Sequence, residues 1–122
     1  MTPRTLVRFF AWLCLAAIAA LSLVSPSMRP VTDLPHDFEH AAIFALTGLA
    51  IGLGYPGRIM RDVAWLTVFA AAIELAQVAV PGRHARWIDF IVDAAAACAG
   101  VVLAFIAARL LRRTAPNQAA PR

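Results

Sequence analysis

The sequence contains no lysine, one tyrosine and two cysteines, and charged residues make up only 15% of it. All 11 basic residues are therefore arginines, a bias that we attribute to base composition. In contrast, 61% of the 122 residues are hydrophobic, whereas soluble domains average about 45–50%. A soluble domain of this size would have too little polar surface to cover so much apolar material. We therefore expect a single domain whose outer surface faces lipid.

Several classes of function lack their usual sequence signals. The arginines lie between apolar blocks and form no basic stripe interleaved with aromatics, so the net charge of +4 does not indicate nucleic-acid binding. Cys14 and Cys98 lie in apolar runs without a CxxC partner or a histidine at metal-ligand spacing, and we interpret them as apolar filler. We expect no bound metal ion and no cofactor.

Four apolar segments predict an all-α fold, a compact bundle of four transmembrane helices. The segments cover residues 5–24, 38–54, 62–80 and 87–111. They are separated by breaks rich in proline and glycine, and their lengths suit a hydrocarbon core about 30 Å thick. No period-2 alternation favours strands. Residues 1–113 are thus predicted to form one transmembrane domain, and residues 114–122, with two prolines, a disordered cytoplasmic tail.

The first segment also resembles a signal peptide, with Arg4 and Arg8 before its apolar stretch and small residues near its end. That stretch is longer than the usual run of about 7–15 residues, so we expect the helix to be retained. In the third segment, we expect Asp62 to cap the start of the helix.

The distribution of arginine predicts the orientation. The N-terminal end, the second connection and the C-terminal end hold eight arginines: Arg4, Arg8, Arg58, Arg61, Arg109, Arg112, Arg113 and Arg122. The first and third connections hold three: Arg29, Arg83 and Arg86. Four spans place both termini on the same side, and the excess of arginine places that side in the cytoplasm.

In this orientation, polar residues from three stretches lie at the outer end of the bundle. They are His36, Asp37, Glu39 and His40 in the second segment, Glu74 and Gln77 in the third, Arg83 and Arg86 before the fourth, and Asp89 and Asp93 inside it. Spacings of three and four residues place Glu74 with Gln77, and Asp89 with Asp93, on shared helix faces. A charge in hydrocarbon costs about 2.5–3.5 kcal/mol, so we expect these acids to turn inward around a hydrated pocket.

Small residues predict close packing of the four helices. The second segment carries a stripe of Ala41, Ala45, Gly48 and Gly52, and the fourth carries Ala96, Gly100, Ala104 and Ala108. Such stripes let the backbones of membrane helices come together.

The polar residues and their spacing resemble the VanZ-like family. One stretch, residues 37–48, matches the family's histidine followed by an aromatic residue at His40 and Phe44. A second, residues 74–100, matches the pattern Glu-x-x-Gln, an arginine in a loop, then Asp-x-x-x-Asn and small residues. It covers Glu74, Gln77, Arg83, Asp89 and Asp93. Two positions depart from the pattern, because the family's Lys is absent and Asp93 stands in place of its Asn.

This resemblance implies a multi-pass protein of the bacterial cytoplasmic (inner) membrane. A better-known relative in the family lowers susceptibility to the cell-envelope antibiotic teicoplanin, which on its own does not imply resistance for this chain. By analogy, the expected partner is a membrane lipid or a lipid-linked cell-envelope precursor, and the chain is also a possible homo-oligomer.

Three functional hypotheses follow from the polar cluster. In the first, the cluster binds an anionic lipid head group; its expected ligand-binding residues are His40, Glu74, Gln77, Arg83, Arg86, Asp89 and Asp93. In the second, it is a membrane-embedded hydrolase or transferase, with candidate catalytic residues His40, Glu74 and Asp89 and with water or Asp89 as nucleophile. A metal-dependent variant would use His36, but no His-Glu-x-x-His motif supports it. In the third, the cluster is only a hydrogen-bond network that sets helix register.

Overall fold

The computed structural model describes residues 2–28 and 35–114, which form four α-helices and one short 3-10 turn. The helices are α1 (Pro3–Leu23), α2 (His36–Gly54), α3 (Ile59–Gln77) and α4 (Trp87–Thr114), and the turn is η1 (Pro26–Met28). These ranges contain no strand, which confirms the all-helical prediction for them. The tail predicted to be disordered lies outside the described residues, apart from Thr114 at the end of α4.

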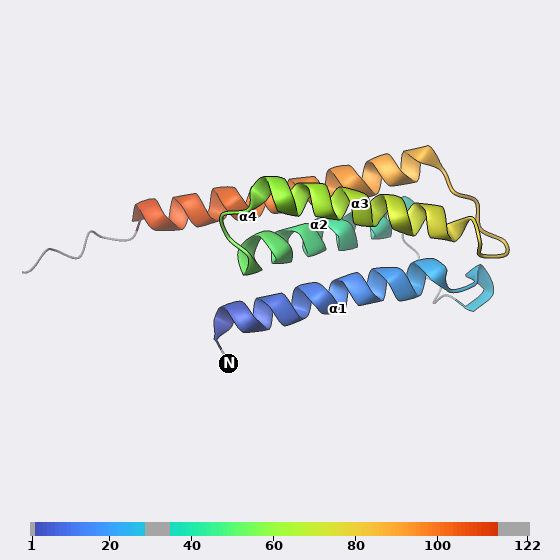
Figure 1. Ribbon diagram of the computed structural model, residues 1–122, viewed down its shortest axis with the longest axis horizontal. Coiled ribbons are helices and arrows are strands. Elements are labelled where there is room, and N and C mark those ends of the chain that lie inside the picture. Colours follow the sequence, from blue (N-terminus) through green and yellow to red (C-terminus); the bar gives the residue numbers. More distant parts are fainter. Residues whose placement is uncertain (1, 29–34, 115–122) are drawn as a thin grey trace, which may run out of the picture.

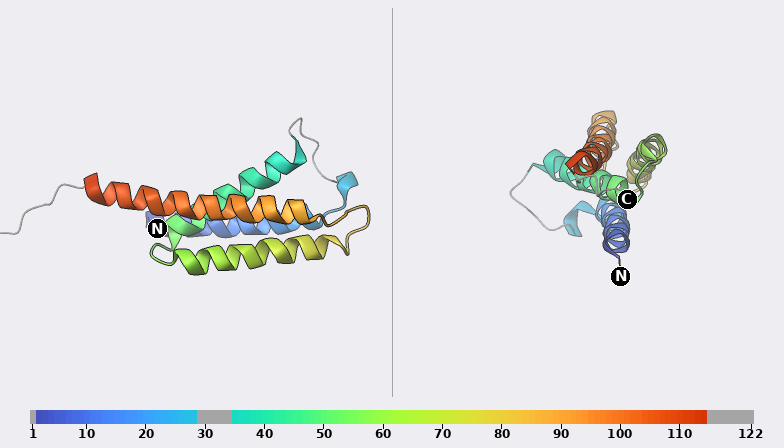
Figure 2. Two further views of the ribbon diagram at one scale, coloured as in Figure 1. Left: turned by 90° about the horizontal axis from the view of Figure 1, so that it is seen from above. Right: turned by 90° about the vertical axis from the view of Figure 1, so that its left-hand side faces the viewer.

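Successive helices run in alternating directions, so that the bundle has two distinct ends (Figure 1). The N-terminus of α1, the α2–α3 turn and the C-terminus of α4 lie at one end. The C-terminus of α1, the start of α2 and the α3–α4 loop lie at the other. The start of α2 leans away from the other helices, as the second view shows (Figure 2). The three stretches that carry the predicted polar residues therefore lie at the same end.

Helix α3 begins and ends three residues earlier than the prediction of residues 62–80. It follows the turn at Gly57, whose φ of 87° is favourable only for glycine. It ends at Gln77 because the next backbone amides bond to the carbonyl three residues earlier and no longer to the one four residues earlier. The Val80 N–H, for example, donates to the carbonyl of Gln77 at 3.0 Å. Asp62 is therefore inside the first turn, Arg58 occupies the N-cap position without a side-chain cap bond, and the expectation that Asp62 caps the helix is wrong.

The tightest packing in the bundle is between α2 and α4. A Cβ atom on Gly48 would lie 2.0 Å from the carbonyl oxygen of Ala97, and one on Gly100 would lie 2.1 Å from that of Ala45. These separations are far below van der Waals contact, so both positions require glycine. Close packing through small residues is thus confirmed for α2 and α4, and the structure adds that these two helices face one another.

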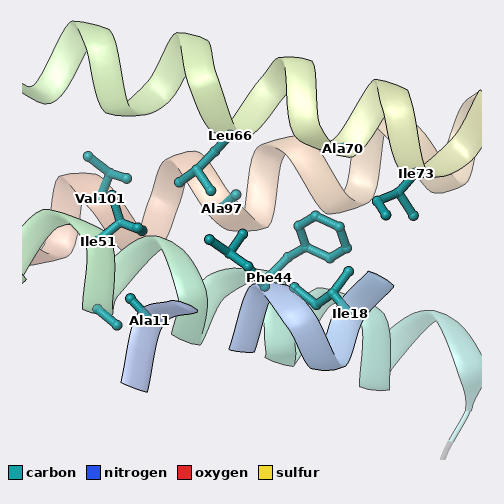
Figure 3. Close-up of a cluster of buried hydrophobic side chains, with 11 residues drawn as sticks. Ala11, Ile18, Phe44, Ile51, Leu66, Ala70, Ile73, Ala97 and Val101 are labelled. Carbon is teal, nitrogen blue, oxygen red and sulfur yellow. The ribbon is translucent and has the colours of Figure 1, made fainter. Parts of the chain in front are cut away.

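A hydrophobic cluster lies along the axis of the bundle and joins all four helices (Figure 3). Phe44 and Leu66 are fully enclosed at its centre, and Ile18 brings in α1 while Val101 brings in α4. The Phe44 ring also contacts the Phe69 ring, with centroids 6.3 Å apart. The cluster is narrow, so most large apolar side chains are outside it.

Two of the helices, α1 and α4, are long and apolar enough to cross a membrane. Only 28% of each apolar stretch is buried within the bundle, whereas the core helix of a soluble protein is mostly buried. Acidic residues in α2, and Arg61, Asp62 and Glu74 in α3, lower the hydropathy of the other two helices. Two of the four predicted spans thus have the length and composition of a membrane-crossing helix.

Candidate functional site

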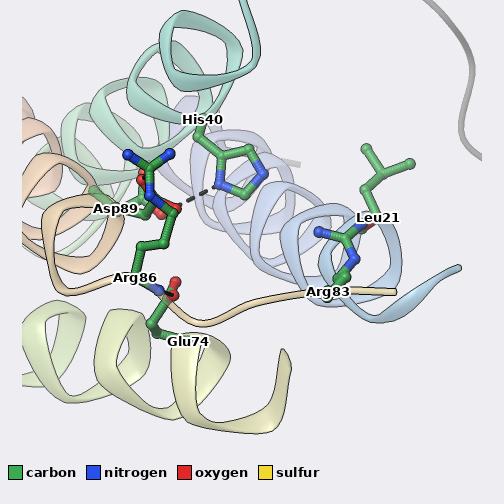
Figure 4. Close-up of polar contacts among 7 residues, drawn as sticks. Leu21, His40, Glu74, Arg83, Arg86 and Asp89 are labelled. Atoms are coloured by element: carbon green, nitrogen blue, oxygen red, sulfur yellow. Dashed lines mark hydrogen bonds and ion pairs between the residues drawn. The ribbon is translucent and has the colours of Figure 1, made fainter. Parts of the chain in front are cut away.

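Side chains from three helices converge at the end of the bundle that holds the α3–α4 loop (Figure 4). They enclose a cavity of about 10 Å³, roughly the volume that one water molecule requires. The lining residues are Asp37 and His40 from α2, Glu74 and Gln77 from α3, and Asp89, Val92 and Asp93 from α4. Five of the seven predicted ligand-binding residues therefore lie together.

The innermost polar contact joins α2 to α4. Nδ1 of His40 donates to Oδ2 of Asp93 at 3.2 Å. Asp93 is only 4% exposed, and its second carboxylate oxygen, Oδ1, has no hydrogen-bond donor among the described residues. The close approach of α2 and α4 at Gly48 and Gly100 brings this pair into contact. A buried carboxylate with an unused lone pair makes the cavity a site for a hydrogen-bond donor.

Glu74 holds the loop that precedes α4. Its Oε1 accepts a hydrogen bond from the backbone N–H of Arg86 at 2.5 Å. The Arg86 guanidinium lies 3.9 Å from Oδ1 of Asp89, a spacing too long for a strong ion pair, and the Arg86 side chain is 61% exposed. The main chain of Arg86 is thus fixed to α3, while its charge remains at the rim of the cavity.

Arg83, in contrast, is directed away from the cavity (Figure 4). Its guanidinium donates to the carbonyl of Leu21 at 2.9 Å and to that of Val24 at 3.2 and 3.1 Å. These carbonyls belong to the last turn and the C-cap of α1, where a helix has unsatisfied acceptors and a negative dipole end. The structure therefore places Arg83, one of the predicted ligand-binding residues, in a contact that ties the α3–α4 loop to α1.

An apolar groove of about 380 Å³ adjoins the polar cavity. Glu74 borders both spaces, and Arg86 borders the groove. The other lining residues are Ala71, Leu75, Val78, Ala85, Trp87 and Phe90. Leu75 is 75% exposed and Trp87 is 84% exposed. Sequence reasoning missed this groove, although the spacing of Glu74, Leu75 and Val78 places apolar residues beside the acid at the end of α3.

The described side chains contain no group of three or more His, Cys, Asp or Glu arranged to hold a metal ion. The side chain of His36, which the metal-dependent variant would use, lies outside the described part of the structure. Four carboxylates face the cavity, with His40 as their nearest basic partner and Arg86 at the rim. The cavity therefore favours groups that donate hydrogen bonds, such as hydroxyls, and the rim favours an anion.

No protein-family model, curated protein or solved structure matches this chain.

Proposed function

We propose that the chain is a four-span integral membrane protein of the VanZ-like kind that binds an anionic lipid head group at its outer end. Membrane insertion is supported by large apolar side chains that are exposed on every helix. Examples are Phe9 on α1, Leu46 on α2, Val68 on α3 and Leu103 on α4. Large apolar side chains exposed on all four helices suit a lipid environment better than water.

In the proposed membrane orientation, the α3–α4 loop lies outside the cell and both ends of the chain lie in the cytoplasm. Arg58, Arg109 and Arg112 lie at the end that would face the cytoplasm, which agrees with the positive-inside rule. The contacts from Arg83 to Leu21 and Val24 make α1 part of the bundle, which favours a retained first helix.

The observation that carries the binding proposal is the junction of the polar cavity and the apolar groove at Glu74. A lipid needs a site of this kind, because its polar head group and its hydrocarbon chain must occupy a polar and an apolar space that adjoin. Arg86 at the junction pairs with a phosphate. The acids accept hydrogen bonds from hydroxyl or amide groups of the head group, and His40 and Gln77 can also donate to them. The groove along Leu75 and Phe90 contacts the chain.

A lipid-linked cell-envelope precursor has these chemical features. It combines a phosphate, a polar group rich in donors and a long apolar chain, and it is present where the outer end of the bundle would lie. Arg83 contributes to this function by positioning the loop that carries Arg86.

Native mass spectrometry of the purified protein with a short-chain polyprenyl phosphate tests this proposal. Wild-type protein is expected to retain the lipid, whereas Arg86→Gln and Glu74→Gln are each expected to weaken retention by about tenfold, which corresponds to about 1.4 kcal/mol. Arg113→Gln, at the opposite end, removes the same charge and serves as the matched control. Equal retention by all four proteins would contradict the assignment of the site.

The His40–Asp93 pair favours a second candidate, a membrane-embedded hydrolase or transferase acting on such a lipid. A carboxylate that orients a histidine is the arrangement of a general base with its supporting acid. The carboxylate that contacts His40 is that of Asp93, which is not among the candidate catalytic residues His40, Glu74 and Asp89 predicted from the sequence. Turnover of the bound polyprenyl phosphate by wild-type protein and its loss in His40→Gln would support the enzyme. A protein that neither retains nor converts the lipid would favour a structural network.

A further inference from the structure

A separate pocket lies at the opposite end of the bundle, between the α2–α3 turn and the C-terminal half of α4. Its volume is about 250 Å³. Its apolar wall is formed mainly by α4, through Val101, Ala104, Phe105 and Ala108. Its charged rim contains Arg58 from the turn and Arg109 and Arg112 from α4. None of these residues takes part in the site around His40 and Asp93.

The positive charge around this pocket is not balanced within it. The acidic residue in the lining is Asp62, which is 4% exposed. Its Oδ1 accepts hydrogen bonds from Nε and Nη2 of Arg61, at 3.1 and 2.8 Å. Across residues 2–28 and 35–114, no ion pair joins Arg58, Arg109 or Arg112 to an acid. Three guanidinium groups therefore face a pocket whose one carboxylate already has a partner.

An aromatic ring holds one of these arginines at the edge of the pocket. Cζ of Arg109 lies 5.0 Å from the centroid of the Phe105 ring, within cation–π range. On the other side of the turn, Cζ of Arg8 lies 4.7 Å from the centroid of the Tyr55 ring, and Nε of Arg8 donates to the carbonyl of Gly54 at 2.8 Å. These contacts restrain Arg109 and the turn that carries Arg58.

The length of α4 places this pocket at the level of a lipid head group. Arg109 is 22 residues after Trp87, which is about 33 Å along a helix with a rise of 1.5 Å per residue. The hydrocarbon core is about 30 Å thick. If Trp87 lies at one interface, Arg109 and Arg112 lie at the other, with the apolar wall of the pocket just inside the hydrocarbon.

We propose that this pocket binds the phosphate of an anionic phospholipid from the leaflet around the α2–α3 turn. Guanidinium groups of Arg58, Arg109 and Arg112 pair with the phosphate oxygens, because their planar donors match phosphate geometry. The first methylene groups of the acyl chains lie against Val101 and Phe105. Basic pockets between transmembrane helices on the cytoplasmic side are suited to such head groups. The proposal rests on the membrane insertion proposed above, and it is independent of the lipid site at the outer end.

The test uses the full-length protein in a neutral detergent, titrated with dioctanoyl phosphatidylglycerol, and native mass spectrometry to count bound lipid. The double variant Arg109→Gln/Arg112→Gln is expected to bind this lipid at least about tenfold more weakly than the wild type. Arg113→Gln is the matched control, since it removes an exposed charge from the same end of α4 but does not line the pocket. It is expected to bind within about twofold of the wild type.

Two further ligands identify what the pocket recognises. Dioctanoyl phosphatidylcholine, which has the same chains and no net charge, and glycerol phosphate, which has the charge without the chains, are both expected to bind at least about tenfold more weakly. Equal binding of glycerol phosphate would overturn the lipid assignment. Equal weakening by Arg113→Gln would show that only general surface charge is involved, which also overturns it. The weakening of phosphatidylglycerol binding by Arg109→Gln/Arg112→Gln is expected to be the same with and without Arg86→Gln, because distant sites act additively, so that the two lipid proposals can fail separately.

Discussion

At the scale of single residues, two neighbouring arginines have different surroundings. Arg86 keeps its guanidinium exposed at the rim of the polar cavity, while Arg83 uses its guanidinium to bind the carbonyls of Leu21 and Val24. A sequence motif that contains a loop arginine does not distinguish these two roles. We therefore expect substitutions at Arg83 to affect stability first, and those at Arg86 to affect ligand binding first.

Replacing Arg83 with glutamine should weaken the attachment of α1. It removes charged donors from helix-terminal carbonyls, and hydrogen bonds to charged groups contribute about 1.5–3 kcal/mol. We expect a lower midpoint of thermal unfolding in detergent, with polyprenyl phosphate retention below that midpoint reduced less than in Arg86→Gln. His84→Gln is the control, because His84 is an exposed neighbour in the same loop. Loss of retention in an Arg83→Gln protein that unfolds like the wild type would instead place Arg83 in direct contact with the ligand.

At the scale of helices, the contact between α2 and α4 positions the site. Gly48 and Gly100 allow backbone contact, and this contact sets the distance between His40 on one helix and Asp93 on the other. The two glycines are separated along the helices from His40 and Asp93, yet the contact between His40 and Asp93 depends on the close approach at the glycines. Close packing therefore supports the site in addition to holding the bundle together.

A methyl group at Gly48 tests this dependence. In Gly48→Ala, the new Cβ would meet the carbonyl oxygen of Ala97 at 2.0 Å, so α2 and α4 must separate. Overpacking of this kind costs about 1–3 kcal/mol. We expect a lower unfolding midpoint and weaker retention of polyprenyl phosphate. Ala99→Val, on an exposed position of α4, adds apolar volume without a facing helix and should behave like the wild type. Unchanged stability in Gly48→Ala would contradict the close approach.

At the scale of the whole molecule, the alternating helix directions produce two chemically different ends (Figure 1). One end is rich in carboxylates around His40, and the other is rich in arginine around the α2–α3 turn. For the membrane insertion proposed above, this asymmetry predicts the orientation, because arginine is retained on the cytoplasmic side. The two proposed lipid sites then lie in opposite leaflets.

Labelling of single cysteines in intact cells tests this orientation. In a Cys14→Ala/Cys98→Ala background, Ser27→Cys and His84→Cys should react with a membrane-impermeant maleimide. Pro56→Cys, in the α2–α3 turn, should react only after the cells are permeabilised. Labelling of Ser27→Cys and His84→Cys on opposite sides of the membrane would rule out the shared outer end and the site built on it.

The sequence by itself was sufficient to predict the four helices, their approximate limits and the small-residue stripes of α2 and α4. These features depend on local signals: apolar length, proline and glycine at the breaks, and small residues four apart. It also placed His40, Glu74 and Asp93 at one end, since helix direction alternates with each break. The limits of α3 were three residues off, because the turn at Val78–Gly82 begins inside the apolar segment.

Only the tertiary structure decided which of these groups meet. Spacing along a helix shows that Asp89 and Asp93 share a face, but the rotation of α4 against α2 determines that Asp93 contacts His40. The direction of Arg83, the groove beside Glu74 and the pocket around Arg109 likewise depend on which helices are neighbours and how closely they pack. Such contacts arise between residues far apart in the chain, and no local pattern encodes the relative rotation of two helices.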